Sequence, residues 1–240
     1  MNYYSLTDKG KVRSVNQDNY VNITKDDFSL FVVADGMGGH NAGEIASFIA
    51  VKSIKEFIEK NSADKDYKDL LLRAIKYANR QIYNRSQIDE KCENMGTTIV
   101  ACLVAGARAY IAHVGDSRAY YFDGEKLSQF TKDHSYVQKL IDTGVLTEES
   151  AKTYENKNLV TNAVGIEENV EISYGYLDIK KDDMLLLTTD GLTNLVEDKE
   201  IIDIITSDMD LEEMAKTLIS MANSLGGYDN ITLTIVKNME

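Results

Sequence analysis

Residues 97–122 read TTIVACLVAGARAYIAHVGDSRAYYF and contain three apolar runs in close succession. The runs cover Thr97–Ala105, Arg108–Val114 and Ala119–Phe122, and they are rich in the β-branched and aromatic residues that are typical of strands. Gly106 separates the first two runs, and a short connection also separates the second from the third. Because consecutive strands joined by short turns pair in antiparallel fashion, this stretch predicts an antiparallel sheet.

Further strand-like runs lie on both sides of this stretch. Asp123-Gly124 is a tight-turn signal between two of them. The additional predicted strands are Tyr20–Ile23, Phe28–Ala34, Lys126–Phe130, Ile172–Leu177, Met184–Thr189 and Ile231–Val236.

Three segments have apolar residues three and four positions apart, which is the period of an amphipathic helix. They are Ile45–Ile58, Tyr67–Ile82 and Leu211–Ala222, and Gly226-Gly227 follows the last one as a stop signal. Two predicted helices lie between early strands and one precedes the final strand. Strands grouped in hairpins with helices inserted between them predict a layered α+β fold, in which helices cover antiparallel sheets.

Length and composition favour one domain over residues 1–240, because no repeat or Gly/Ser linker divides the 240-residue chain. Cys92 and Cys102 match neither a CxxC redox pair nor a zinc knuckle, so we expect two buried, unreactive thiols. No stretch approaches the ~18 apolar residues of a membrane span or resembles a signal peptide. We therefore expect a cytoplasmic protein.

The formal net charge of −13 excludes nucleic acid and anionic membranes as default partners. An enzyme that acts on phosphate would need local positive charge on such an acidic chain. Bound metal ions supply that charge most compactly.

Aspartates stand at the ends of predicted strands whose bodies are apolar. They are Asp18, Asp35, Asp116, Asp190 and Asp229. An aspartate beside a glycine is by itself typical of a turn. If these strand ends converge, however, several negative charges lie beside a low-dielectric core, which is costly without cations. Oxygen ligands favour Mg²⁺ or Mn²⁺, and no cysteine or close histidine pair favours zinc.

The glycine-rich segment Asp35–Gly39 permits two interpretations. It could cradle a phosphate, but it has neither the GxGxxG nor the GxxxxGK[ST] spacing of nucleotide-binding loops. Alternatively, its glycines could let the backbone approach a metal ion, with the Gly36 carbonyl as a ligand.

Six segments of the chain resemble, in the correct order, the motifs of the protein phosphatase 2C (PPM) family in its bacterial form. A single DG or DN pair would be weak support, whereas six ordered motifs that span nearly the whole chain are specific. The segments are Gly10–Asp18 (GKVRSVNQD), Asp35–His40 with Gly43–Ser47, Gly96–Thr98, Val114–Arg118, Thr189–Thr193 and Asp229–Thr232.

The resemblance implies a four-layer α-β-β-α sandwich, in which helices flank two packed antiparallel sheets. It also implies a centre of two Mn²⁺ or Mg²⁺ ions, with a weaker third ion in bacterial members. The ligands of the two main ions would be Asp18, Asp35, Asp190, Asp229 and the Gly36 carbonyl, and the third would take Asp116 with Asp190.

The implied reaction is hydrolysis of phosphoserine and phosphothreonine in proteins. Two cations would lower the pKa of a bridging water, and the resulting hydroxide would attack phosphorus. Arg13 would hold the phosphate through its planar pair of donors. Either His40 or a metal-bound water would protonate the leaving group. No covalent intermediate is expected, so Ser117, Ser135 and Cys102 are not assigned as nucleophiles.

Three other polar residues are expected to be structural. His113 lies inside a predicted strand and is expected in the core, and His134 is also interpreted as structural. Arg118 is expected to pair with carboxylates rather than with substrate.

Residues 134–165 resemble the mobile flap of the family. Asn162 stands where many bacterial relatives have Arg, and their His-Pro pair is absent. The sequence therefore leaves undetermined how the protein selects its substrates and whether the flap supplies a ligand to the third ion.

The leading hypothesis is a monomeric serine/threonine phosphatase that acts on phosphorylated proteins, opposes a bacterial serine/threonine protein kinase and binds neither nucleic acid nor membrane. A narrow regulator of one phosphoserine partner, such as an anti-sigma antagonist, is an alternative within the same chemistry. An inert binding module that kept the fold is an alternative of another class. The presence of all five aspartates and Arg13 argues against the inert module.

Overall fold

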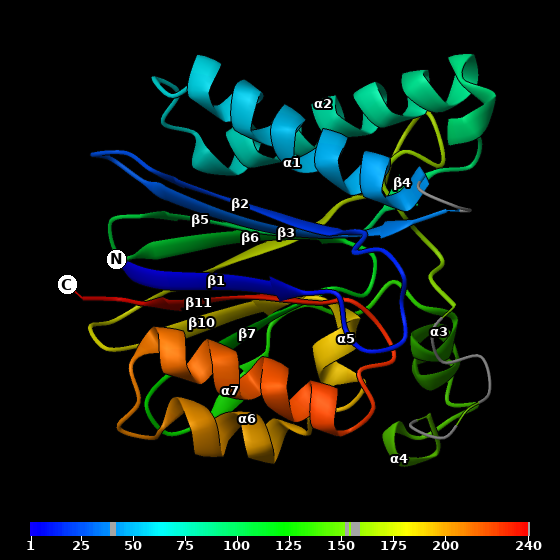
Figure 1. Cartoon of the computed structure of the whole chain (residues 1–240). Helices are drawn as coiled ribbons and strands as arrows, with labels where there is room; N and C mark the ends of the chain where they lie inside the picture. The colour runs from blue at the N-terminus through cyan, green and yellow to red at the C-terminus, as the bar shows by residue number, and fades with distance from the viewer. Residues whose placement is uncertain (39–41, 152–153, 155–158, 240) are drawn as a thin grey trace.

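The structure is a computed structural model that describes residues 1–38, 42–151, 154 and 159–239. Two antiparallel sheets lie face to face, and helices cover the outer side of each (Figure 1). The order of layers is therefore helices, sheet, sheet, helices, which confirms the predicted four-layer α+β sandwich.

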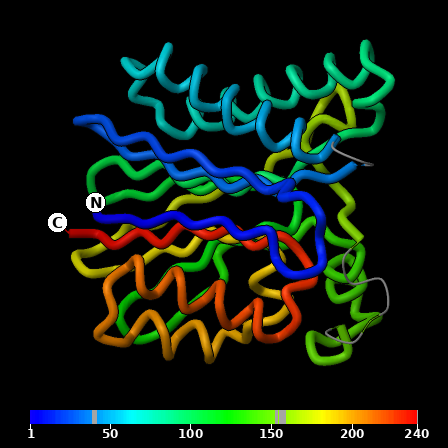
Figure 2. Tube along the Cα trace, viewed as in Figure 1, coloured from blue at the N-terminus to red at the C-terminus, as the bar shows by residue number. Residues whose placement is uncertain are grey.

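The first sheet contains both ends of the chain. Its strand order is β1 (Asn2–Asp8), β11 (Ile231–Lys237), β10 (Met184–Thr188), β7 (Arg118–Phe122) and β8 (Leu127–Gln129). The first and last strands pair along their whole length, so the blue and red ends of the trace run side by side in Figure 2. Helices α6 (Asp198–Ile205) and α7 (Leu211–Ser224) cover its outer face.

The second sheet is formed by the early and middle parts of the chain. Its strand order is β2 (Asp18–Thr24), β3 (Ser29–Met37), β5 (Ile99–Ala105), β6 (Arg108–Val114) and β9 (Ser173–Asp178). The short strand β4 (Gly96–Thr97) pairs with the end of β3. Helices α1 (Ala42–Lys60) and α2 (Tyr67–Ile88) cover this sheet.

The central strands are buried on both faces, which explains their continuous apolar sequence. In β5, Val100 and Cys102 face the other sheet, whereas Ile99 and Leu103 face the helices. Successive side chains of a strand point to opposite faces, so a strand between two apolar layers needs apolar residues at every position.

All the predicted strands and the three predicted helices are present, although Thr98 divides the predicted strand Thr97–Ala105 between β4 and β5. β3 is longer than predicted because its end pairs with β4, and β8 is shorter. β1 was missed, because its sequence NYYSLTD is half polar and it lies at a sheet edge. The short helices were also missed; besides α6 they are η1 (Glu90–Cys92), α3 (Tyr136–Asp142), α4 (Glu148–Ala151) and α5 (Asp190–Thr193).

Two further predictions concern the cysteines and the membrane. Cys92 and Cys102 are both free and buried, as predicted. No helix in the described part of the chain combines the length and apolarity that a membrane crossing requires.

Helix α2 anchors the segment that leads from the flap region into β9. Asn79 is 2% exposed, and its amide nitrogen donates hydrogen bonds of 3.0 Å to the carbonyls of Glu167 and Glu168. Its amide oxygen accepts a 2.7 Å bond from the Gly165 backbone nitrogen. One buried side chain therefore fixes three backbone groups of this segment.

Replacement of Asn79 by alanine is expected to lower the free energy of unfolding by about 1–3 kcal/mol, because it leaves the buried Gly165 N–H without its acceptor. Urea denaturation at equilibrium measures this change. Lys76→Ala, an exposed change on the same helix, is the control and should stay within about 0.5 kcal/mol of the parent protein. Equal stability of the two variants would contradict the anchoring role.

Candidate functional site

The five predicted aspartates come together although they are far apart in sequence. Asp18 and Asp35 face each other as partners in the β2–β3 pair. The charges of Asp18, Asp190, Asp116 and Asp229 all raise the pKa of Asp35, which requires that they lie near it. The sequence-predicted set is therefore a spatial cluster.

Each aspartate takes its place from a different element. Asp18 begins β2, Asp35 lies inside β3, Asp116 follows β6, Asp190 begins α5 directly after β10, and Asp229 precedes β11. Because β3 and β10 come from different sheets, the cluster joins the two halves of the sandwich.

Two glycines of the predicted motifs allow backbone segments to touch beside the cluster. A Cβ atom on Gly36 would lie 2.0 Å from the carbonyl oxygen of Gly43 and 2.6 Å from that of Gln17. A Cβ atom on Gly191 would lie 1.9 Å from the carbonyl oxygen of Asn230. These distances are shorter than any real contact, so a larger residue at either position would force the segments apart.

Burial raises the pKa of four of the five aspartates, with neighbouring charges as a further cause. The pKa of Asp190 is raised to about 6, that of Asp18 to about 7 and that of Asp116 to about 8. The pKa of Asp35 is also raised well above its usual value. The site therefore has an excess of negative charge, which either protons or cations can neutralise.

Two oxygens of the cluster have no hydrogen-bond partner among the described residues. They are Oδ1 of Asp18 and Oδ1 of Asp190, and both are buried. Oδ2 of Asp18, by contrast, accepts a 2.9 Å bond from the Thr189 hydroxyl. Because buried polar atoms in folded proteins usually have partners, the two unpaired oxygens fit the role of cation ligands.

The donor set of the cluster consists of carboxylate oxygens, which fit a hard cation. Within residues 1–38, 42–151, 154 and 159–239, no group of three or more His, Cys, Asp or Glu side chains has the spacing to hold a metal ion by itself. Carboxylates are nevertheless suitable ligands for Mg²⁺ and Mn²⁺, because both ions prefer oxygen ligands.

Arg13 and Asp229, two of the predicted site residues, form an ion pair. Nη2 of Arg13 donates to Oδ2 of Asp229 at 2.7 Å, and about half of the arginine side chain is exposed. This hydrogen bond is the main reason that the pKa of Arg13 is raised. The predicted phosphate ligand thus lies beside a predicted metal ligand and remains accessible.

The sequence interpretation missed the role of Asn230. This residue is 3% exposed, and its amide oxygen accepts a 2.8 Å bond from the Gln17 backbone nitrogen. Its amide nitrogen donates to the carbonyls of Lys9 and Val15 at 2.8 and 3.0 Å. Asn230 therefore fixes both ends of the loop that carries Arg13. Its position after Asp229 in a recognised motif was the available signal.

Buried hydroxyl groups that orient the aspartates were also missed. The Thr98 hydroxyl accepts a 3.1 Å bond from the Asp35 backbone nitrogen and lies 2.6 Å from the Ser117 hydroxyl. Thr98 and Ser117 both belong to the predicted motifs, but the sequence did not reveal which aspartate these hydroxyls would support.

The expectations for His113 and Arg118 are confirmed. His113 is buried with Nε2 2.8 Å from the Lys132 carbonyl, and burial lowers its pKa. Arg118 donates through Nε and Nη2 to the carboxylate of Asp133. His134, interpreted as structural, accepts a 3.3 Å bond at Nδ1 from the Gly115 backbone nitrogen.

The flap region encloses a cleft of about 700 Å³ that Met37 also lines, two residues after Asp35. Asn162 lies in this cleft, donates a 2.8 Å bond to the Glu171 carbonyl and lies 3.1 Å from Nδ1 of His134. Asn162, which stands where many bacterial relatives have Arg, thus contacts residues of the protein itself. His40, the candidate proton donor, lies outside the described residues.

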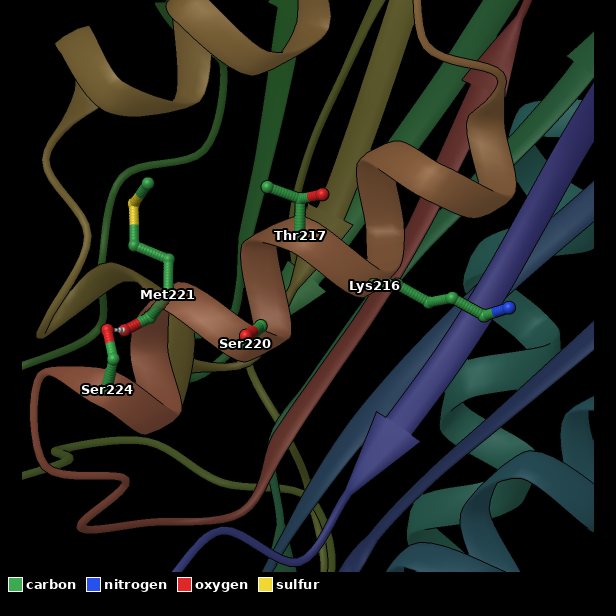
Figure 3. A pocket seen from close by; sticks show the side chains of 5 residues that line it. All are labelled: Lys216, Thr217, Ser220, Met221 and Ser224. Atoms are coloured by element: carbon green, nitrogen blue, oxygen red, sulfur yellow. Dashed lines mark hydrogen bonds between the residues drawn. The ribbon is translucent and has the colours of Figure 1, made fainter.

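A second hollow, of about 470 Å³, lies on the surface of α7 (Figure 3), and none of the five aspartates lines it. Its lining side chains come from one helix and include a single charged group, that of Lys216. They are Lys216, Thr217, Ser220, Met221 and Ser224. The aspartate cluster, with its unpaired oxygens, is therefore the candidate functional site.

Comparison with known proteins agrees with this geometry. Residues 9–231 match the family described as protein phosphatase 2C. The serine/threonine phosphatase stp of Listeria welshimeri is 39% identical over 235 residues, which cover 96% of this chain and 93% of that protein.

Solved structures extend the agreement to three dimensions. Serine/threonine phosphatase Stp1 from Staphylococcus aureus superimposes with a TM-score of 0.94 at 33% identity, over 99% of this chain and 95% of that one. The catalytic domain of the phosphatase PstP, solved in complex with two manganese ions, gives 0.89 at 32% identity, over 100% and 98%. The predicted enzyme class is confirmed. The chain belongs to the protein phosphatase 2C family.

Proposed function

We propose that this protein phosphatase hydrolyses phosphoserine and phosphothreonine in other proteins, with divalent cations bound at the aspartate cluster. The observation that carries the proposal is the pair of buried, unpaired oxygens of Asp18 and Asp190 within a group of five carboxylates. Relatives named serine/threonine phosphatase support the substrate class, and the manganese complex of a relative supports the cations.

The proposed cations are two Mn²⁺ or Mg²⁺ ions, with a weaker third. When bound, they would lower the pKa of a coordinated water and neutralise charge on the phosphate. Asp18, Asp35, Asp190, Asp229 and the Gly36 carbonyl would hold the main pair, and Asp116 with Asp190 would hold the third.

Arg13 is proposed to bind the phosphate of the substrate. Its guanidinium offers a planar set of donors that cannot lose its charge, and its exposed half is accessible beside Asp229. A phosphate dianion would compete with the Asp229 carboxylate for the same donors. For the proton that the leaving alkoxide needs, His40 and a coordinated water remain the two proposed sources.

We further propose a monomeric, cytoplasmic enzyme that opposes a serine/threonine protein kinase. Residues 1–240 would act as one domain, with residues 134–165 as the flap over the site. The free, buried thiols of Cys92 and Cys102 fit a reducing compartment.

Asp35→Ala and Asp190→Ala are expected to lower Mn²⁺-dependent hydrolysis by more than about 100-fold, because residues that only support metal ligands already cost 10- to 100-fold. Turnover of p-nitrophenyl phosphate and of a phosphothreonine peptide measures this loss. Asp203→Ala, an exposed change on α6, is the control. Absence of turnover by the folded parent protein at saturating Mn²⁺ would refute the proposed function.

The metal-free protein is expected to lose stability as the pH rises from about 4 to about 8. The folded-state pKa values of Asp190, Asp18 and Asp116 are raised to about 6, 7 and 8 from an ordinary value of 3.8. Folding therefore favours the protonated forms, and this contribution is complete below 3.8 and disappears as each carboxyl ionises in the folded state.

Asp18→Asn tests this expectation, because the amide removes one titrating charge and keeps an acceptor for Thr189. In EDTA, the variant should gain stability relative to the parent protein between pH 5 and pH 8. In excess Mn²⁺, the parent should instead be more stable than the variant, since metal at 100 times its Kd stabilises the parent by about 2.7 kcal/mol. Thermal unfolding of the parent and of the variant, each in EDTA and in excess Mn²⁺, measures both effects. The same difference in stability between parent and variant in EDTA and in Mn²⁺ would contradict the cluster.

Asn230→Ala is expected to lower kcat/KM by about 10- to 100-fold, because a displacement of about 1 Å in a positioned group can cost that much. The loop that carries Arg13 loses three hydrogen bonds in this variant. Steady-state kinetics with a phosphothreonine peptide measures the loss, and circular dichroism verifies the fold. Asn2→Ala, at an exposed position, is the control. Unchanged kinetics would show that the loop keeps Arg13 in place without Asn230.

A further inference from the structure

The connection between β1 and β2 presents three cations on an acidic protein. Lys9, Lys11 and Arg13 alternate with Gly10 and Val12, and all three cationic side chains are exposed. No acidic residue occurs among residues 9–14, whereas the whole chain has a formal charge of −13. Residues 9–13 of this connection are called the basic loop below.

The basic loop is held in one conformation by contacts with the segment before β11. The backbone nitrogens of Lys11 and Val12 both donate to the Gly227 carbonyl, at 2.8 and 3.2 Å. A Cβ atom on Gly10 would lie 2.2 Å from the Asp229 carbonyl oxygen, so the two segments touch. In Figures 1 and 2 the blue connection after β1 correspondingly lies against the red segment that precedes β11.

The basic loop also lies at the candidate phosphate site. Arg13 is hydrogen-bonded to Asp229. The side chain of Lys11 lies against Gly227: its Cγ would be 3.3 Å from a Cβ atom placed on that glycine. Tyr228, which stands between Gly227 and Asp229 in the sequence, is 64% exposed. A substrate whose phosphate reaches Arg13 would therefore have its neighbouring residues near Lys11.

We propose that the basic loop is a subsite for acidic side chains that flank the phosphorylated residue of the substrate, with Lys11 as a specificity-determining residue. This inference rests on the proposed function. The occupant is a phosphorylated protein segment with Asp or Glu within a few positions of its phosphoserine or phosphothreonine.

Electrostatic range explains why an acidic protein can select acidic substrates. At physiological ionic strength, exposed charges more than about 8 Å apart are largely screened from each other. Carboxylates farther away than this have little effect on a bound peptide. The nearby Asp229 pairs with Arg13, so Lys9 and Lys11 supply the remaining positive charge of the basic loop. Because hydrogen bonds fix the loop before binding, little conformational entropy is lost when it meets the substrate.

The test compares two phosphothreonine peptides of equal length, one with Glu and one with Gln at the flanking positions. We measure the ratio of their kcat/KM values for the parent protein, Lys11→Gln, Lys11→Glu and Lys55→Gln. The parent should favour the Glu peptide, Lys11→Gln should reduce the ratio by about 2- to 5-fold, as expected for one exposed ion pair, and Lys11→Glu should reduce it further. Lys55→Gln, an exposed change on α1, should keep the parent ratio.

Added KCl should lower the parent ratio and change that of Lys11→Gln less, because salt screens the exposed charge pair that only the parent can form. Equal ratios for the parent and Lys11→Glu, with both peptides hydrolysed, would overturn the inference and leave the proposed function intact. Failure of the parent protein to hydrolyse either peptide or p-nitrophenyl phosphate would overturn both.

Discussion

Repulsion among carboxylates at a junction of two sheets is the constraint on which the rest of this structure depends. Asp18 and Asp35 come from one sheet, whereas Asp190 and Asp229 border strands of the other. Burial makes their ionisation costly, and their proximity adds to this cost. The sandwich must hold these groups together against a force that would separate its layers, and the large apolar cores on both sides of each sheet provide that stability.

Close backbone contacts make the junction rigid. Gly36 meets Gln17 and Gly43, and Gly191 meets Asn230, at distances that exclude any side chain. The Gly36 contacts lie in the half of the sandwich that contains β2 and β3, and the Gly191 contact lies in the half that contains β10 and β11. Hydrogen bonds from Gln17 to Asn230 and from Thr189 to Asp18 join the two halves. A site built in this way keeps the carboxylates in position whether or not they are neutralised, which is the preorganisation that electrostatic catalysis requires.

The polar groups around the site have separate roles. Buried hydroxyls, such as that of Thr189, orient individual carboxylates. Asn230 fixes the loop that carries Arg13, which places a permanent cation at the edge of an acidic cluster. An anionic substrate thus meets positive charge at the surface before it reaches the carboxylates. The flap cleft, which Met37 lines, has mixed charge, and there Asn162 donates to the Glu171 carbonyl and lies beside Nδ1 of His134.

Much of the fold and of the candidate site could be predicted from sequence alone. Continuous apolar runs such as Ile99–Ala105 require burial on both faces, and the period of α7 requires one apolar face, so these elements follow from local pattern. The aspartates were identifiable because strand ends are marked by glycine and because six motifs occur in order. β1 was not predictable, since its burial comes from the distant strand β11. α6 was missed because its eight residues are fewer than the roughly 11–18 over which helical periodicity is read.

The sequence by itself thus determined which residues carry negative charge, where the strands other than β1 lie and to which family the chain belongs. Only the tertiary structure decided that Asn230 holds the Arg13 loop, that Arg13 pairs with Asp229, and that one oxygen each of Asp18 and Asp190 has no partner among the described residues. Those facts depend on contacts between residues more than 170 positions apart, as the Thr189–Asp18 bond at a separation of 171 illustrates. Local pattern encodes burial and periodicity, whereas such contacts exist only after the two sheets have packed together.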